Sequence, residues 1–132
     1  MKKLITILFL FVSLRLFAPG YTVGYIAEGT KIDPYSKYWK AVCIVESHNN
    51  ARIINPLENA YGISQIRWRK LEDYNKSHGT NYTLKNCLDS AFSRKVFYWH
   101  MSQYKNETVA VMRWNGKGKK AVEYRIKIKK HL

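Results

Sequence analysis

One glutamate in this chain stands where its surroundings can turn it into a proton donor. If residues 38–47 form a helix, three apolar residues share the face of Glu46. They are Trp39, Val42 and Cys43, which precede it by seven, four and three positions. A carboxyl group on such a surface loses hydration, so its pKa rises and it stays protonated near neutral pH, as a general acid requires. A solvated glutamate at a helix end is the alternative reading of Glu46 alone.

Two later blocks add groups suited to a binding cleft. Residues 60–66 read Ala-Tyr-Gly-Ile-Ser-Gln-Ile, and residues 109–118 run from apolar residues into Trp-Asn-Gly-Lys-Gly. Each block also has an ordinary explanation. Gln65 is compatible with the polar side of an amphipathic helix, and Asn115 followed by glycine is a common turn dipeptide. Their order along the chain is therefore more informative than either block.

Together these blocks resemble the lytic transglycosylase domain of the lysozyme-like superfamily, in its soluble and goose-type-like branch. Glu46-Ser47 matches the family's Glu-Ser at a helix end. Residues 60–66 match its Gly-Ala-x-Gly-Leu-Met-Gln-Ile/Leu pattern, and residues 109–118 match its apolar run into Tyr-Asn-x-Gly. Tyr124 lies where a tyrosine often follows that third block. The resemblance covers about residues 35–128.

The resemblance implies a reaction on peptidoglycan glycan strands and a role for each matched residue. Glu46 would protonate O4 of N-acetylglucosamine as its bond from N-acetylmuramic acid breaks. It would then act as base on the muramoyl C6 hydroxyl, which gives a 1,6-anhydro product without a cofactor. Ser47 and Gln65 would orient Glu46 or bind the sugar. Gly62 would let the backbone approach the substrate, and Asn115 would line the opposite wall of the cleft.

The third block departs from the family pattern at a position that matters for the acid. Trp114 stands where the family has a tyrosine whose hydroxyl approaches the catalytic glutamate. Tryptophan can pack against substrate and donate one N–H, but it supplies no hydroxyl. We therefore expect Trp114 to contact the substrate and expect the pKa of Glu46 to depend more on burial. Ser64 also replaces a methionine that often lines the cleft.

Two other functions within this fold remain open. A muramidase-type hydrolase needs a group that activates water, often a second carboxylate. Among the acidic residues near Glu46 in sequence, Glu58 is the best placed because its loop precedes Gly62. A cell-wall-binding module without useful turnover is the other alternative.

Composition and charge favour a folded domain with an anionic partner. The chain has 132 residues, 46% hydrophobic and 14% aromatic, which suits one domain and excludes a disordered basic tail. Its net charge of +14 predicts attraction to an anionic polymer, such as the cell envelope or nucleic acid. No nucleic-acid motif is recognised, so we expect the envelope and not nucleic acid. We expect a monomer.

The N-terminus has the pattern of an export signal. Two lysines precede an almost wholly apolar run over residues 4–14, and Ala-Pro-Gly follows at residues 18–20. We expect residues 1–20 to be the signal, with an uncertain cleavage point, and residues 21–132 to be the transglycosylase domain. Without the signal, twenty basic and nine acidic residues leave a net charge of +11. The predicted location is the periplasm, the cell envelope or the extracellular space.

The apolar periodicity predicts a mainly α, small lysozyme-like domain, with at most a minimal β element. We expect helices over residues 33–47, 61–77, 84–104, 109–114 and 121–129. The second can begin with a short turn, and the last can alternatively be a strand. Cys43 and Cys87 are either a disulfide or two buried thiols. The histidines and cysteines show no zinc-site spacing, so no metal is predicted.

Overall fold

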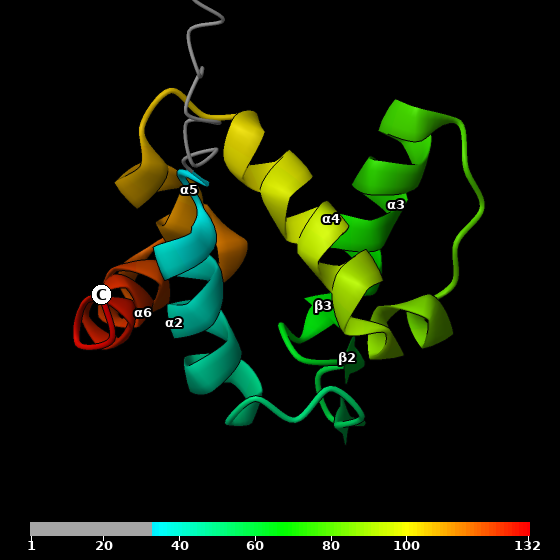
Figure 1. Cartoon of the computed structure of the whole chain (residues 1–132), viewed down its shortest axis with the longest axis horizontal. Helices are drawn as coiled ribbons and strands as arrows, with labels where there is room; N and C mark the ends of the chain where they lie inside the picture. Colours follow the sequence, from blue (N-terminus) through cyan, green and yellow to red (C-terminus); the bar gives the residue numbers. More distant parts are fainter. Residues whose placement is uncertain (1–32) are drawn as a thin grey trace, which may run out of the picture. The chain divides into compact units, whose positions relative to one another are not determined.

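The structure is a computed structural model that describes residues 33–132. The expected signal, residues 1–20, and residues 21–32 lie outside the described residues. The described part contains five α-helices, one 3-10 helix and a small three-stranded sheet (Figure 1). The mainly α, lysozyme-like fold class is therefore confirmed, including its minimal β element.

Helix α2, Ser36–Ser47, carries Glu46 in its last turn. Its buried face includes Ala41, Val42 and Cys43, so the predicted apolar face is real. The helix begins at Ser36, later than the predicted residue 33, with Tyr35 at the N-cap position. It ends at Ser47, and the C-cap residue His48 follows in the left-handed region with a φ of 51°.

The segment after α2 forms a small antiparallel sheet where we predicted loop and helix. Strands β1 (Ile54–Asn55), β2 (Ala60–Tyr61) and β3 (Ile66–Arg67) lie in the order β1-β2-β3. The turn between β2 and β3 contains two residues with positive φ, Gly62 at 79° and Gln65 at 50°. A right-handed helix cannot pass through such residues. Helix α3, Trp68–His78, therefore starts only after β3.

The predicted helix over residues 84–104 is two elements. The 3-10 helix η1, Leu84–Leu88, is followed by α4, Ser90–Ser102. Asp89 separates them with extended backbone, and its side chain accepts a 2.8 Å hydrogen bond from the N–H of Ala91. An N-cap of this kind starts a new helix in the middle of an unbroken apolar stripe.

Two helices complete the chain. Helix α5, Glu107–Trp114, is capped by Asn106, whose side chain accepts from the N–H of Val109 at 3.1 Å. Helix α6, Lys119–Lys129, confirms the helix favoured over a strand in this segment. Ala121, Tyr124 and Ile128 share one face of this helix and are buried, which is why the helical period prevails there.

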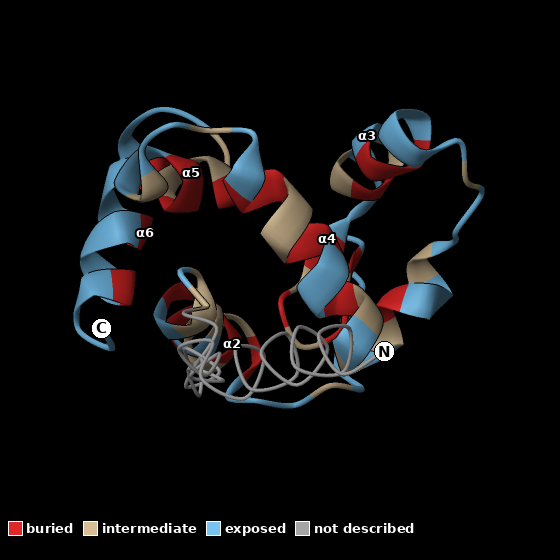
Figure 2. Cartoon of the chain, turned by 45° about the horizontal axis from the view of Figure 1, so that its top comes forward, coloured by how far each residue is buried: buried red, intermediate tan, exposed pale blue. Residues whose placement is uncertain are grey.

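The core joins these elements around Phe97 of α4. Helix α4 lies between α3 and α5, and α2 packs on α6 (Figure 1). The buried faces of the helices point inward and their exposed faces outward (Figure 2). The Phe97 ring lies 5.5 Å from Trp39 and 5.0 Å from Trp114, between centroids. Packing against Phe97 thus fixes the position of the Trp114 ring.

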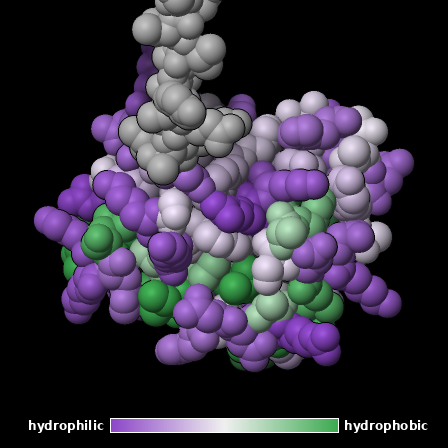
Figure 3. Space-filling view, in the orientation of Figure 1, coloured by the Kyte–Doolittle hydropathy of each residue, from purple (hydrophilic) through white to green (hydrophobic). Residues whose placement is uncertain are grey.

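The described residues include two buried cysteines that are free. Burial raises the pKa of the Cys43 and Cys87 thiols to about 12 each, so both stay protonated. Residues 33–132 contain no group of three potential metal-ligating side chains and no helix with the length and apolar character to cross a membrane. The face in Figure 3 is largely hydrophilic, with small groups of hydrophobic side chains between the polar ones.

Candidate active site

Glu46 lies where two cavities meet. The first, of about 480 Å³, is lined by Glu46, Gln65, Trp114 and Asn115 among others. The second, of about 730 Å³, is lined by Glu46, Asn115 and Tyr124 among others. Three of the sequence-predicted site residues besides Glu46 therefore surround one space. A carboxyl with open space on both sides is placed to act on a bond inside a long ligand.

Burial is the main influence on the Glu46 carboxyl. It raises the pKa from the ordinary value of 4.5 to about 7. The Tyr124 side chain and the positive charge of Arg67 oppose this rise, and the negative charge of Glu58 adds to it. At neutral pH the carboxyl is therefore divided between its protonated and ionised forms, so it can both give and take a proton.

Trp114 supplies no hydroxyl to Glu46, but Tyr124 brings a phenol hydroxyl close to it. Its side chain reaches from α6 into the second cavity and is only 4% exposed. Burial, followed by the charge of Glu46, raises the Tyr124 pKa well above 10, so the phenol keeps its proton. The hydroxyl is near enough to Glu46 to lower the carboxyl pKa, but its geometry falls short of a full hydrogen bond. Tyr124 therefore faces the carboxyl as a donor.

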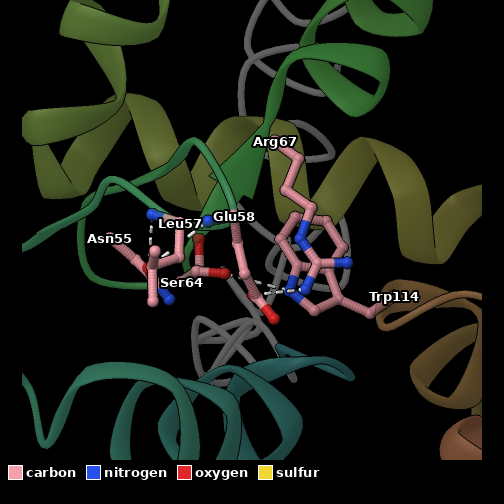
Figure 4. A network of polar contacts seen from close by, with 6 residues as sticks. All are labelled: Asn55, Leu57, Glu58, Ser64, Arg67 and Trp114. Carbon is pink, nitrogen blue, oxygen red and sulfur yellow. Dashed lines mark hydrogen bonds and ion pairs between the residues drawn. The ribbon is translucent and has the colours of Figure 1, made fainter.

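Trp114 connects two walls of the first cavity. Its indole N–H donates a 3.1 Å hydrogen bond to the carbonyl oxygen of Ser64, in the turn between β2 and β3 (Figure 4). Its ring also packs against His100 at 5.2 Å between centroids. Since the ring is 7% exposed, it contributes a mostly buried edge to the cavity. The tryptophan holds the turn that carries Gln65 against α5.

Two of the predicted substrate-binding residues line neither cavity. The Ser47 hydroxyl lies 2.7 Å from the Ile63 carbonyl oxygen and 3.1 Å from that of Cys43, and can donate to either. At Gly62, a Cβ atom would lie 1.8 Å from the carbonyl oxygen of Cys87. The glycine therefore allows close packing of the turn on η1, whereas we expected it to admit substrate. Both residues hold the turn behind the site.

Gln65 and Asn115 do line the first cavity, as predicted for a binding cleft. The side-chain amide of Gln65 donates to the Gly62 carbonyl oxygen at 2.9 Å, which fixes it across its own turn. Asn115 terminates α5 and lines the second cavity as well. Together they place polar groups on two sides of Glu46.

Two further carboxyls line the larger cavity with Glu46, those of Glu58 and Glu123. Glu58, from the turn between β1 and β2, forms an ion pair with Arg67 of β3 (Figure 4). The turn itself is held by Asn55, whose side-chain oxygen accepts the N–H of Leu57 at 3.1 Å. The Glu58 and Arg67 side chains are 52% and 47% exposed, so water screens much of their attraction.

The cations that line the first cavity were not predicted as site residues from the sequence. Arg69 and Lys70 are in the first turn of α3, and Arg113 is in the last turn of α5. Nothing in their spacing distinguishes them from the solvated lysines and arginines elsewhere in this basic chain. They become a group only because α3 and α5 face the same space.

The comparison with known families bears on this arrangement. The family model of the transglycosylase SLT domain matches residues 26–132. No curated protein and no solved structure matches the chain.

Proposed function

The chain belongs to the transglycosylase SLT domain family, and from that premise we propose that Glu46 is the acid and base of its reaction. The family makes the chain a lytic transglycosylase of the lysozyme-like superfamily that cleaves peptidoglycan. The proposal adds the bond, between N-acetylmuramic acid and N-acetylglucosamine, and the 1,6-anhydro product. The observation that carries it is the partly buried Glu46 carboxyl, with a pKa of about 7, between two cavities.

In the proposed first step, protonated Glu46 donates its proton to the glycosidic O4 as the bond to muramoyl C1 breaks. N-acetylglucosamine then leaves with a neutral hydroxyl, and Glu46 is left as a carboxylate. The Tyr124 phenol, still protonated, faces this carboxylate and stabilises its negative charge. Proton donation is thereby favoured in a site whose burial otherwise opposes ionisation.

In the second step, the carboxylate of Glu46 takes the proton from the muramoyl C6 hydroxyl. The C6 oxygen attacks C1 of the same sugar and closes the 1,6-anhydro ring. Glu46 regains its proton, so the enzyme returns to its starting state and no water is consumed. A pKa near 7 suits both steps because neither protonation state is costly at neutral pH.

The positioning residues act through the turn between β2 and β3. Ser47 directly follows Glu46 in sequence. Its hydroxyl can donate to the Ile63 carbonyl oxygen, which connects the end of α2 to this turn. Trp114 fixes the same turn from α5. We assign Gln65 and Asn115 to the substrate, since both line the space beside Glu46.

Glu58 favours a second candidate function, muramidase-type hydrolysis. Its carboxyl lies in the same cavity as Glu46, where a hydrolase needs a group to activate water. Its ion pair with Arg67 occupies this carboxyl. Glu58→Gln separates the two functions, because it abolishes hydrolysis and leaves anhydro-product formation intact.

The net charge supports a cell-envelope location. A chain of +14, or +11 without residues 1–20, is attracted to the anionic wall, and salt weakens this attraction. We propose that residues 1–20 export the protein to that location and that it acts as a monomer. A non-catalytic wall-binding role is the alternative that shares these properties.

Muropeptide analysis tests the proposed function. Purified peptidoglycan is digested with the protein, and the soluble products are identified by mass spectrometry. Anhydro ends, lighter by one water than reducing ends, are the expected products. New reducing ends would establish the muramidase instead, and the absence of soluble products would leave only wall binding.

A further inference from the structure

The first cavity carries positive charge that the proposed chemistry of Glu46 does not use. Five cationic side chains line it, compared with the carboxyls of Glu46 and Asp73. The cations are Arg67, Arg69, Lys70, Arg113 and Lys117. Arg67 is already paired with Glu58. Lys70 is the cation whose position is most closely determined by its neighbours.

Three neutral groups hold the Lys70 ammonium. Its Nζ lies 3.1 Å from Nδ1 of His100 and 3.4 Å from the carbonyl oxygen of Arg113. The same atom lies 5.1 Å from the centroid of the Trp114 ring, within the range of a cation–π interaction. These contacts come from α4 and α5, whereas Lys70 itself is on α3. The ammonium is therefore fixed between three helices.

His100 is arranged to accept a hydrogen bond from the Lys70 ammonium while its own ring stays neutral. Its Nε2 lies 2.8 Å from the carbonyl oxygen of Ala110, which can only accept, so Nε2 carries the hydrogen. Nδ1 is then the acceptor for the ammonium. Burial and the nearby charge of Lys70 lower the His100 pKa to about 4, which keeps the ring neutral at physiological pH. His100 thus positions the positive charge and does not add to it.

No carboxylate of the described residues pairs with Lys70. Ion pairs within residues 33–132 join Arg67 to Glu58 and Lys76 to Glu72, and neither involves Lys70. Asp73 favours the Lys70 charge from a distance, but burial is the larger influence and lowers the Lys70 pKa to about 8. The ammonium is still mostly protonated at pH 7. A partly buried charge without a counter-ion favours the arrival of an anion that can hydrogen-bond to it.

We propose that Lys70, held by His100, Trp114 and the Arg113 carbonyl, binds a carboxylate of the peptide stem carried by the glycan strand. This inference depends on the proposed function, because a strand with its scissile bond at Glu46 extends its substituents into the same cavity. The amide link to the peptide neutralises the lactyl carboxyl of the sugar, so the strand's remaining carboxylates belong to the peptide. Lys70 therefore selects strands that still carry charged peptides.

Binding measurements with the full chain test this inference. Glu46→Gln stops turnover, and isothermal titration calorimetry then compares two soluble glycan fragments that differ only in whether the peptide carboxylates are free or amidated. We expect the free carboxylates to bind roughly tenfold more tightly, as one charge-assisted hydrogen bond allows. Adding Lys70→Met removes this preference and leaves the affinity for the amidated fragment unchanged.

Lys76→Met is the matched control. Lys76 is on the same helix, carries the same charge and pairs with Glu72, but it lines neither cavity. The preference should survive this substitution. Equal losses in the two variants, or no preference before either substitution, would overturn the inference. A circular-dichroism melt of each variant verifies that it is folded, and the amidated fragment tests the inference without any change at Lys70.

A third fragment separates the two sources of carboxylate. Removing the peptide with an amidase exposes the lactyl carboxylate on the sugar itself. If this fragment binds as tightly as the charged peptide form, and does so through Lys70, the peptide assignment is wrong. Digestion of unmodified and amidated peptidoglycan by the protein with its native Glu46 separates the two hypotheses. If neither substrate is cleaved, the proposed function is contradicted. Equal cleavage and equal binding of both contradict only the role of Lys70.

Discussion

Glu46 and Lys70 line the same cavity and lose hydration through burial, but their neighbours give them different tasks. Burial raises the Glu46 pKa to about 7 and lowers the Lys70 pKa to about 8, so each group moves towards its neutral form. Glu46 faces the phenol of Tyr124, a donor that favours loss of the acid proton. Lys70 faces acceptors, chiefly His100, that favour keeping its proton.

The comparison shows that burial alone does not make a group catalytic. A buried acid with a donor beside it can release its proton and recover it at neutral pH. A buried cation surrounded by neutral acceptors keeps its proton and remains a fixed charge. The first arrangement suits chemistry and the second suits recognition. Variants that exchange or remove these neighbours can therefore test each assignment.

Glu46→Gln should have the largest effect. It removes the group that gives and takes the proton, so release of soluble products should fall by roughly 10²–10⁴-fold. Binding to purified peptidoglycan should persist, because Lys70 and the rest of the cleft are unchanged. Glu107→Gln, outside both cavities, is the control and should keep full activity. Unchanged product release by Glu46→Gln would remove Glu46 from the mechanism.

The pH dependence should separate the two groups. Glu46 must be protonated for the first step, so kcat/KM should fall about tenfold per pH unit above pH 7. Lys70 loses its charge only above about pH 8, so the preference for charged peptides should persist into a higher pH range. Initial rates and binding over pH 5–9 measure both. A single shared midpoint for rate and preference would contradict the separation.

Tyr124→Phe should have a smaller effect, confined to the Glu46 end of the cavity. The phenol lowers the Glu46 pKa, so its loss should raise that pKa and move the fall in activity to higher pH. We also expect a loss of several-fold in rate, since the carboxylate formed in the first step loses its donor. Stability should change little, because the buried hydroxyl has no full hydrogen bond to lose. Steady-state pH profiles and thermal melts measure these effects.

Tyr82→Phe, at an exposed tyrosine outside both cavities, provides the control for Tyr124. It should leave the pH profile unchanged. A Tyr124→Phe profile that also stays unchanged would show that the phenol does not influence Glu46.

Ser47→Ala should have the smallest effect and should act on stability. The hydroxyl donates to a backbone carbonyl, with the shorter distance to Ile63, and its loss should cost about 1–2 kcal/mol of unfolding free energy. Ser102→Ala is the control, because that exposed hydroxyl bonds only locally, donating to the Trp99 carbonyl oxygen and accepting from the Gln103 side chain. Urea melts compare the two. A Ser47→Ala loss no larger than the Ser102→Ala loss would contradict the role of Ser47 in holding the turn.

The sequence predicted the acid end of the cavity better than the cationic end. The apolar period before Glu46 correctly predicted the buried face of α2, and Tyr124 is buried in a segment predicted to be helical. Both follow from regular helical spacing, which the sequence displays directly. Lys70 and His100 are thirty positions apart, and their contact depends on how α3 packs on α4. No local pattern contains that information.

Local geometry explains the remaining errors. The strands are two residues long, too short for an alternating pattern, and the positive φ of Gln65 cannot be read from a residue that favours helices. The prediction of a single helix over residues 84–104 was wrong because the Asp89 side chain caps a new helix there, although the apolar stripe continues through this position. The close approach of the Cys87 carbonyl oxygen to Gly62 was not predicted, because Cys87 belongs to a segment that is distant in sequence.

The central claim is that burial keeps Glu46 partly protonated at neutral pH. Titration of its side-chain carboxyl by carbon-13 nuclear magnetic resonance tests this directly, with the signal assigned by its loss in Glu46→Gln. We predict a midpoint near pH 7. A midpoint near the ordinary value of 4.5 would show that Glu46 is fully ionised at neutral pH and would contradict its role as the proton donor.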